Sequence, residues 1–323
     1  MDRRNGYMLG GRLGRRGYDW WWHSLVGISQ TTGEKQPFFI EYFFVNPHLA
    51  TDMPVFGQLP ANRDSGIAPS YGMIKAGTWA EGKAVQIHNF FPFSACRADS
   101  GKMDLRIGDS TASETALQGA VRLSEVEAVA HPEYLSGAGE MSWNLSARKR
   151  ISWSVGWGTS ALMRWLDAFE MYWHVPGMRT DYEGTITYNG QVFRVEADTC
   201  AGYQDKNWGR DFTSPWVWLN CNNLRDNQTG KVEPDASLDV GGGRPVVFGH
   251  AFPRRLLVAF SRHGELYQWN FSRFWTGAKQ RFKCTVGDRD IRWQIEAWDR
   301  RRRIVIDFRC PRNRMLRVNY ENP

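Results

Sequence analysis

The sequence predicts an all-β protein of two β-barrel domains with few short helices, spanning residues 1–212 and 213–323. Most of its periodic segments alternate apolar and polar residues with a period of two, which is typical of half-buried strands. Helical periodicity is scarce, and Gly and Asn turns separate the segments, as in barrels and sandwiches. A Trp-x-Trp segment opens each half ("YDWWWHSLVG" and "SPWVWLNC"), and each is followed by a Thr-Gly turn and an apolar strand.

The individual elements follow from the same patterns. Strands are predicted at 38–46, 83–91, 120–128, 150–155, 254–260, 281–286 and 290–298, and "RRRRIVIDFRC" near the end is predicted as a strand with a solvated arginine face. In "GTITYNGQVFRV", Asn189-Gly190 between alternating runs predicts a type I′ hairpin. A short helix is expected within 159–170, capped by Thr159 or Ser160, with Leu162, Trp165 and Leu166 on one face. The run "GGGRP" (241–245) is expected to be a flexible turn in a loop.

Composition limits the functional classes. The chain has 323 residues, 16 Trp and a formal net charge of +7. Trp lines ligand pockets as well as cores, because it joins a large apolar area to one N–H donor. The positive charge is concentrated near the two termini, and no nucleic-acid recognition motif accompanies it, so no nucleic-acid partner is expected. Peripheral association with an anionic membrane through this basic surface stays open.

The absence of other motifs also guides the prediction. The N-terminus has charges but no apolar h-region, and no apolar run approaches the ~20 residues of a membrane span. The five cysteines are scattered without C-x-x-C spacing, so we expect free thiols and a cytoplasmic location. Phosphate-binding, dinucleotide and serine-hydrolase motifs are missing, and the His residues are dispersed, so neither a cofactor nor a metal is expected.

One stretch stands out, "GYQDKNWGRDFTSPWVWLNCN" from Gly202 to Asn222. With "MYWHVPGM" and "YEGTITYNGQVFRV" before it, this stretch resembles the tocopherol cyclase-like family and its wider superfamily, which includes carotenoid 1,2-hydratases, kievitone-type hydratases and some pericyclases. The resemblance is strongest over 171–222 and implies two lipocalin-like barrels. It also implies protonation of an unactivated carbon–carbon double bond, followed by attack of an internal phenol or of water.

Such chemistry needs a carboxylic acid that stays protonated, aromatic faces near the developing cation, and a dry pocket. The resemblance assigns the acid to Asp205, with Trp208 as cation stabiliser and Asn207 as the residue that orients the acid or the nucleophile. The alternatives are a turn aspartate paired with Lys206, a core tryptophan and a turn asparagine.

Two further candidates lie outside the motif. Glu41 interrupts "FFIEYFF" and faces either a lined cavity or solvent. His174 in "MYWHVPG" is a candidate base that receives the phenol or water proton, or else a buried structural histidine. We expect Glu41, His174, Asp205 and Trp208 to converge on one cavity. The aromatic residues expected to bind substrate with Asn207 and Trp208 are Trp22, Tyr172, Tyr203 and Trp218.

These predictions combine into a cofactor-independent cyclase or hydratase acting on a lipophilic, prenylated or aromatic alkene. A non-catalytic carrier of a hydrophobic ligand, or a pericyclase of secondary metabolism, would need the same aromatic pocket, and both remain alternatives. The identity of the substrate and the oligomeric state are not predicted by the sequence.

Overall fold

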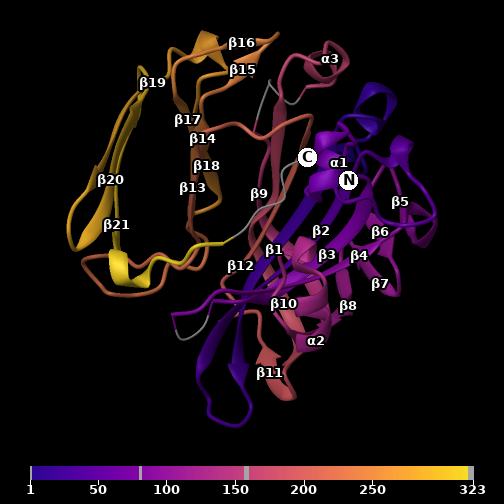
Figure 1. The fold of residues 1–323 in the computed structure, drawn as a ribbon. Helices are drawn as coiled ribbons and strands as arrows, with labels where there is room; N and C mark the ends of the chain where they lie inside the picture. The colour runs from indigo at the N-terminus through magenta and orange to yellow at the C-terminus, as the bar shows by residue number, and fades with distance from the viewer. Residues whose placement is uncertain (1, 80–81, 156–159, 319–323) are drawn as a thin grey trace. The chain divides into compact units, whose positions relative to one another are not determined.

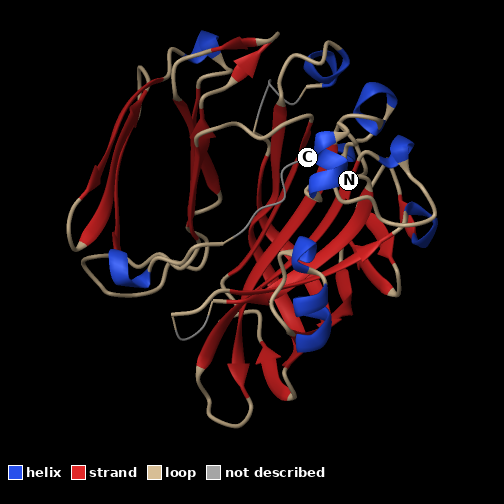
Figure 2. Cartoon of the chain, viewed as in Figure 1, coloured by secondary structure: helices blue, strands red, loops and turns tan. Residues whose placement is uncertain are grey.

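The computed structural model describes residues 2–79, 82–155 and 160–318, and these are built mainly of β-strands (Figures 1 and 2). The described α-helices are short, namely α1 (Pro60–Asp64), α2 (Glu125–Ala130) and α3 (Ala161–Trp165). Short 3-10 turns lie at Arg3–Asn5, Gly11–Gly14, Pro47–Leu49, Phe93–Ala95, Pro132–Tyr134, Phe274–Thr276 and Arg312–Arg314. The structure therefore confirms the predicted all-β class with barrel-like sheets.

The chain divides into two compact units, each described here by itself. Unit 1 comprises Met1–Ser152, Trp173–Phe212 and Val318–Pro323, and unit 2 comprises Trp153–Tyr172 and Thr213–Arg317. One division thus falls between Phe212 and Thr213, where the sequence placed its domain boundary. The segment Trp153–Tyr172 groups with unit 2, although the sequence analysis kept it in the first domain.

Unit 1 is a single antiparallel sheet that curls into a barrel. Its strands are β1 (Tyr18–Ser29), β2 (Lys35–Val45), β3 (Tyr71–Thr78), β4 (Val85–Phe91), β5 (Cys96–Ala98), β6 (Asp104–Ile107), β7 (Ser110–Ser113), β8 (Ala116–Leu123), β9 (Gly139–Trp153), β10 (Met171–Tyr188), β11 (Gln191–Val195) and β12 (Gly202–Gly209). They pair in the order β4-β3-β2-β1-β11-β10-β9-β8-β7-β6-β5, and β12 also pairs with β1 and β10. The Asn89 amide links β4 to the backbone of Arg122 on β8 at 2.9 and 3.0 Å, which closes the barrel.

The barrel interior is apolar because alternate residues of the strands point inward. Trp21 of β1, Tyr42 of β2 and Ile74 of β3 belong to this core, together with Trp143 of β9. The opposite face of β1, β2, β3 and β12 is also buried. Every residue of β12 is therefore buried, and Lys35 is the one exposed residue of β2. Strands that are buried on both faces carry runs such as "FFIEYFFV" instead of a strict polar alternation.

Two local predictions in unit 1 have different outcomes. The hairpin is confirmed, since Tyr188 pairs with Gln191 and both Asn189 and Gly190 have positive φ. The predicted strand 120–128 is too long, because β8 ends at Leu123 and α2 starts at Glu125. The physical reason is a capping box: the Ser124 hydroxyl accepts from the Glu127 N–H, and the Glu127 carboxylate accepts from the Ser124 N–H.

Unit 2 contains the sheet β13-β14-β17-β18, the sheet β19-β20-β21 and the hairpin β15-β16. Their bounds are β13 Trp216–Cys221, β14 Ser237–Gly243, β15 Val246–Val247, β16 His250–Ala251, β17 Arg255–Arg262, β18 Glu265–Asn270, β19 Lys279–Val286, β20 Asp290–Trp298 and β21 Arg303–Pro311. Val240 and Val258 of the first sheet share one apolar core with Ile295 and Ile306 of the second.

Two predictions for unit 2 are corrected. The helix α3 has only five residues, and Ser160 caps it by accepting from the Met163 N–H, whereas Thr159 lies outside the described residues. The prediction of a loop at 241–245 is wrong for Gly241–Gly243, because these three residues form the end of β14 and pair with both β13 and β17. Glycine is required here because the neighbouring strand lies too close for a side chain. A Cβ on Gly242 would lie 2.2 Å from the Arg255 carbonyl oxygen.

Candidate functional site

Strand β12 carries the "GYQDKNWG" motif, and every one of its residues is buried. It lies beside β1 and β10 (Figure 1). Successive side chains of a strand point to opposite faces, so Asp205 and Asn207 share one face while Lys206 and Trp208 share the other. The motif therefore places Asp205 and Lys206 next to each other in sequence, with their side chains on opposite sides of the barrel wall.

The face that points away from the barrel core, which we call the Asp205 face, is fixed by strand register. Trp22 of β1 pairs with Asp205 on one side and with Glu41 of β2 on the other, and Glu41 pairs with Lys75 of β3. Directly paired residues have their side chains on the same face. The structure thus brings together Asp205, Asn207, Glu41 and Trp22 from the sequence-predicted set, and alternation adds Tyr203 to the same face.

Asp205 is the most distinctive residue of this face. Its Oδ2 accepts a hydrogen bond from Trp173 Nε1 at 2.8 Å and from Asn207 Nδ2 at 3.4 Å. Its Oδ1 is buried and has no hydrogen-bond partner among the described residues. Burial raises the pKa of Asp205 to about 7, and the two hydrogen bonds oppose this rise only in part. Burial thus favours the protonated form of this carboxyl group at pH values where an exposed aspartate is ionised.

Other buried polar atoms on the Asp205 face also lack a hydrogen-bond partner among the described residues. They include Asn207 Oδ1 and Trp22 Nε1, which belong to neighbouring strands. Buried polar groups in folded proteins are nearly always paired, so orphaned atoms gathered on one face require an explanation. A ligand that accepts from Trp22 and donates to Asn207 would satisfy both.

Glu41 is buried in the same face but has a charged partner. Its Oε2 lies 2.9 Å from Lys75 Nζ, and both side chains are at most 1% exposed. A buried pair of opposite charges favours the ionised carboxylate. The sequence analysis missed Lys75, although the alternation of "YGMIKAGT" would have placed it on a strand among apolar residues.

Aromatic rings surround these groups. The Trp22 ring stacks on Phe39 with centroids 5.0 Å apart. Trp79 stacks on Phe39 at 4.8 Å and lies 5.9 Å from Trp22, so the three rings form one cluster. Trp20 meets Trp22 edge-on at 5.9 Å. The Asp205 face therefore carries electron-rich rings next to a protonated acid. Sequence reasoning also missed Trp173, the hydrogen-bond donor to Asp205, although it lies in the quoted "MYWHVPGM".

The opposite face of β12 carries a different cluster, inside the barrel. Lys206 forms a buried ion pair with Asp19, and its Nζ lies 3.6 Å from the Trp21 ring centroid and 5.3 Å from that of Trp208. The Met8 N–H also donates to Asp19 at 2.7 Å. Burial raises the pKa of Asp19 to about 6 and lowers that of Lys206 to about 8, and their mutual attraction opposes both shifts. Trp208 thus packs over the ammonium of Lys206 and does not face Asp205.

His174 also belongs to the inner side. It follows Trp173, which points to Asp205, so strand alternation sends it to the other face. Its Nε2 lies 3.0 Å from Asn5 Oδ1, and the Asn5 carbonyl accepts from Trp21 Nε1 in the core. Burial lowers the pKa of His174 to about 3, so the ring is neutral. The prediction that Glu41, His174, Asp205 and Trp208 converge on one cavity is therefore wrong. Glu41 and Asp205 share the outer face of the barrel wall, whereas His174 and Trp208 lie on its inner face.

The remaining predicted residues, Tyr172 and Trp218, belong to unit 2. The Tyr172 hydroxyl donates to the Met163 carbonyl at 3.1 Å, and Trp218 Nε1 donates to Asp239 Oδ1 at 3.2 Å. Their roles in substrate binding stay predictions.

Metal and membrane features are limited within the part of the chain that the structure describes. No group of three or more His, Cys, Asp or Glu side chains there could hold a metal ion. Among the same residues, no helix is long and apolar enough to cross a membrane. All five cysteines are free.

The fold and the site together describe a β-barrel protein with a buried carboxyl group of raised pKa beside tryptophan rings in the barrel wall. The sequence profile of the tocopherol cyclase-like family matches residues 106–319, and the chain belongs to this family. This confirms the resemblance found in the motif "GYQDKNWG".

Two relatives named tocopherol cyclase agree with this placement. A protein of Oryza sativa subsp. japonica named "Probable tocopherol cyclase, chloroplastic" is 26% identical over 173 residues, which cover 51% of this chain and 32% of that protein. The "Tocopherol cyclase, chloroplastic" of Zea mays is 26% identical over 172 residues, covering 51% and 31%. The matched region thus spans about a third of these relatives. A crystal structure from Nitrosomonas europaea described as a candidate AttH protein has a TM-score of 0.48 at 12% identity, covering 90% of this chain and 81% of that chain.

Proposed function

We propose that this protein is a cyclase that closes a ring on a lipophilic prenylated phenol by protonating its double bond, with Asp205 as the acid. The observation that carries the proposal is the buried Asp205 carboxyl, which has one oxygen without a partner among the described residues and a pKa raised to about 7. Membership of the tocopherol cyclase-like family supports the reaction class.

The proposed reaction balances without any change of oxidation state. The Asp205 carboxyl transfers its proton to one carbon of the double bond, and the other carbon becomes a tertiary cation. The phenol oxygen of the same substrate attacks this cation and forms the ring C–O bond. The phenol then loses its proton to the Asp205 carboxylate, so the acid is regenerated and the product is an isomer of the substrate.

The surroundings of Asp205 favour each step. Trp22 and Trp173 place aromatic rings next to the acid, and a cation–π contact in a desolvated site is worth about 2 kcal/mol or more. After proton transfer, the hydrogen bonds from Trp173 and Asn207 stabilise the carboxylate. The partnerless oxygen of Asn207 is suited to accept the hydrogen bond of the substrate hydroxyl before attack.

The test compares Asp205→Asn with a matched control, Asp181→Asn. Asp181 is equally buried in unit 1 but is ion-paired with Arg148 and Arg150, so it controls for the loss of a buried carboxyl group away from Asp205. We expect turnover of a responsive prenylated hydroquinone to fall by about 10²- to 10⁴-fold in Asp205→Asn, with substrate affinity nearly unchanged. Asp181→Asn should keep its activity per folded molecule. Full activity of a folded Asp205→Asn protein would exclude Asp205 as the acid.

Reaction in heavy water separates the alternatives. A cyclase of the proposed type places one deuterium on carbon and gives a product isomeric with its substrate. A hydratase adds the elements of water, a pericyclase incorporates no deuterium, and a carrier returns the ligand unchanged. Mass spectrometry of the products therefore distinguishes the cyclase from each of these.

A further inference from the structure

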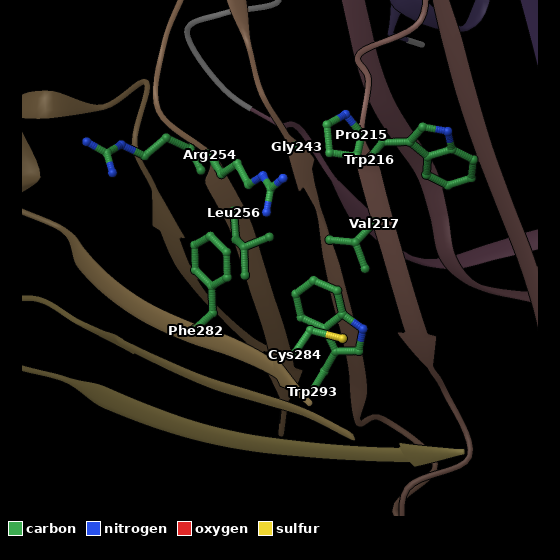
Figure 3. Close-up of a pocket in the computed structure, with 10 residues that line it drawn as sticks. Pro215, Trp216, Val217, Gly243, Arg254, Leu256, Phe282, Cys284 and Trp293 are labelled. Carbon is green, nitrogen blue, oxygen red and sulfur yellow. The ribbon is translucent and has the colours of Figure 1, made fainter. Parts of the chain in front are cut away.

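Unit 2 contains a pocket of about 350 Å³ that is separate from the residues of the Asp205 face. The sheet β13-β14-β17 supplies Val217 and Leu256 to its walls, and β19 and β20 supply Phe282, Cys284 and Trp293 (Figure 3). Its volume is at the low end of the ~300–1,000 Å³ typical of small-molecule sites.

The glycine run "GGG" reaches the wall of this pocket at Gly243. Gly242 pairs with Val217 on one side and with Leu256 on the other, so it occupies the register position between two residues that line the pocket. Gly243 lines the pocket directly and contributes only backbone. A Cβ on Gly243 would lie 2.3 Å from the Pro215 carbonyl oxygen, so larger residues are excluded here.

The opposite wall is aromatic and contains a thiol. The rings of Phe282 and Trp293 stack with centroids 6.4 Å apart at an interplanar angle of 28°. Cys284 pairs with Trp293 across the β19–β20 ladder and is exposed, so its thiol is open to reagents. This wall suits an apolar ligand body.

The charged side chains that line the pocket are all positive. Arg254 and Arg255 both line it and are exposed, and no carboxylate is among its lining residues. Neither arginine has an ion-pair partner among the described residues. An arginine fork recognises a carboxylate by paired hydrogen bonds, so a negatively charged head group is the complement of this end of the pocket.

We infer that this pocket binds an anionic amphiphile, with its apolar body against Phe282 and Trp293 and its carboxylate at Arg254 and Arg255. The inference does not depend on the proposed cyclase activity, because no residue of the Asp205 face takes part. It assigns unit 2 a ligand site of its own.

Alkylation of the Cys284 thiol in the full chain tests the site. We expect decanoate to slow alkylation of Cys284 as it saturates the pocket, whereas the equally long neutral 1-decanol protects much less. Cys310 is also exposed but does not line the pocket, so it is an internal control in the same peptide mass spectrum. Equal protection by the alcohol, protection of Cys310 to the same degree, or no protection of Cys284 would each overturn the proposal.

Variants at the arginines make the test independent of the thiol. Arg254→Gln with Arg255→Gln should weaken decanoate binding by about 10- to 100-fold and leave the weaker binding of 1-decanol unchanged. Both arginines are exposed, so this variant should fold. Arg300→Gln with Arg301→Gln is the matched control, because both residues are exposed and lie outside the pocket, and it should bind decanoate like the unaltered protein. Unchanged decanoate affinity in the arginine variant would contradict the assignment of the head group.

Discussion

At the residue scale, the proposed reaction depends on the protonation state of Asp205. Burial raises its pKa to about 7, and only the protonated form can donate a proton. Turnover should therefore be high below about pH 7 and fall as the pH rises through this value. A pH–rate profile of the purified protein checks this, and a rate that is independent of pH up to pH 9 would contradict the assignment.

The same pKa shift predicts a change in stability that needs no substrate. Because the native pKa of Asp205 lies above its ordinary value of 3.8, the native state holds a proton that the unfolded state has lost between about pH 4 and pH 7. The contribution of Asp205 to stability therefore falls as the pH rises through this window. Asp205→Asn should gain stability relative to the unaltered protein over the same window, as measured by urea unfolding. A constant difference between the two proteins would contradict the raised pKa.

Lys206 has a structural role that its neighbour Asp205 does not share. Lys206→Met should destabilise the protein by about 3–5 kcal/mol, because it leaves the Asp19 carboxylate buried without its cation. The double variant Asp19→Leu with Lys206→Met removes both charges and should recover most of this loss. Urea unfolding of the two variants decides the point, and a Lys206→Met protein as stable as the original would show that the ion pair is dispensable.

At the element scale, helix α3 exposes large apolar side chains. Leu162 is 51% exposed and Trp165 is 80% exposed, so the apolar face predicted from sequence exists but is not packed. An exposed tryptophan and leucine on one helix face form a surface suited to the interface of a membrane. We propose that α3 contributes to the peripheral membrane association left open by the charge of +7.

Vesicle sedimentation tests this role of α3. Trp165→Ser with Leu162→Ser should reduce binding to anionic phospholipid vesicles and change the stability by no more than about 0.5 kcal/mol, since both residues are exposed. Val126→Ser with Val129→Ser, on the exposed face of α2, is the matched control. Equal binding by all three proteins would exclude α3 as a contact.

At the scale of the whole molecule, the two units divide the chain unequally. Unit 1 holds the family motif and a barrel core, and unit 2 holds a separate core between two sheets together with the Arg254–Arg255 pocket. The chain passes between the units more than once, because Trp153–Tyr172 leaves unit 1 after β9 and returns along β10. Sequence periodicity cannot detect this excursion, since it depends on long-range contacts.

By itself, the sequence determined the fold class, the hairpin at Asn189-Gly190 and the family resemblance of the motif around Asp205, because period-two alternation, turn chemistry and a short motif are local properties. The sequence also implied that Asp205 and Trp208 point to opposite faces of the sheet, because they are three positions apart on one strand. Only the tertiary structure decided that Trp22, Glu41 and Lys75 share the sheet face of Asp205, with Trp22 directly beside it. Strand register across β1, β2, β3 and β12 joins residues far apart in the chain, and burial on both faces of these strands, which raises the pKa of Asp205, is a property of the assembled barrel.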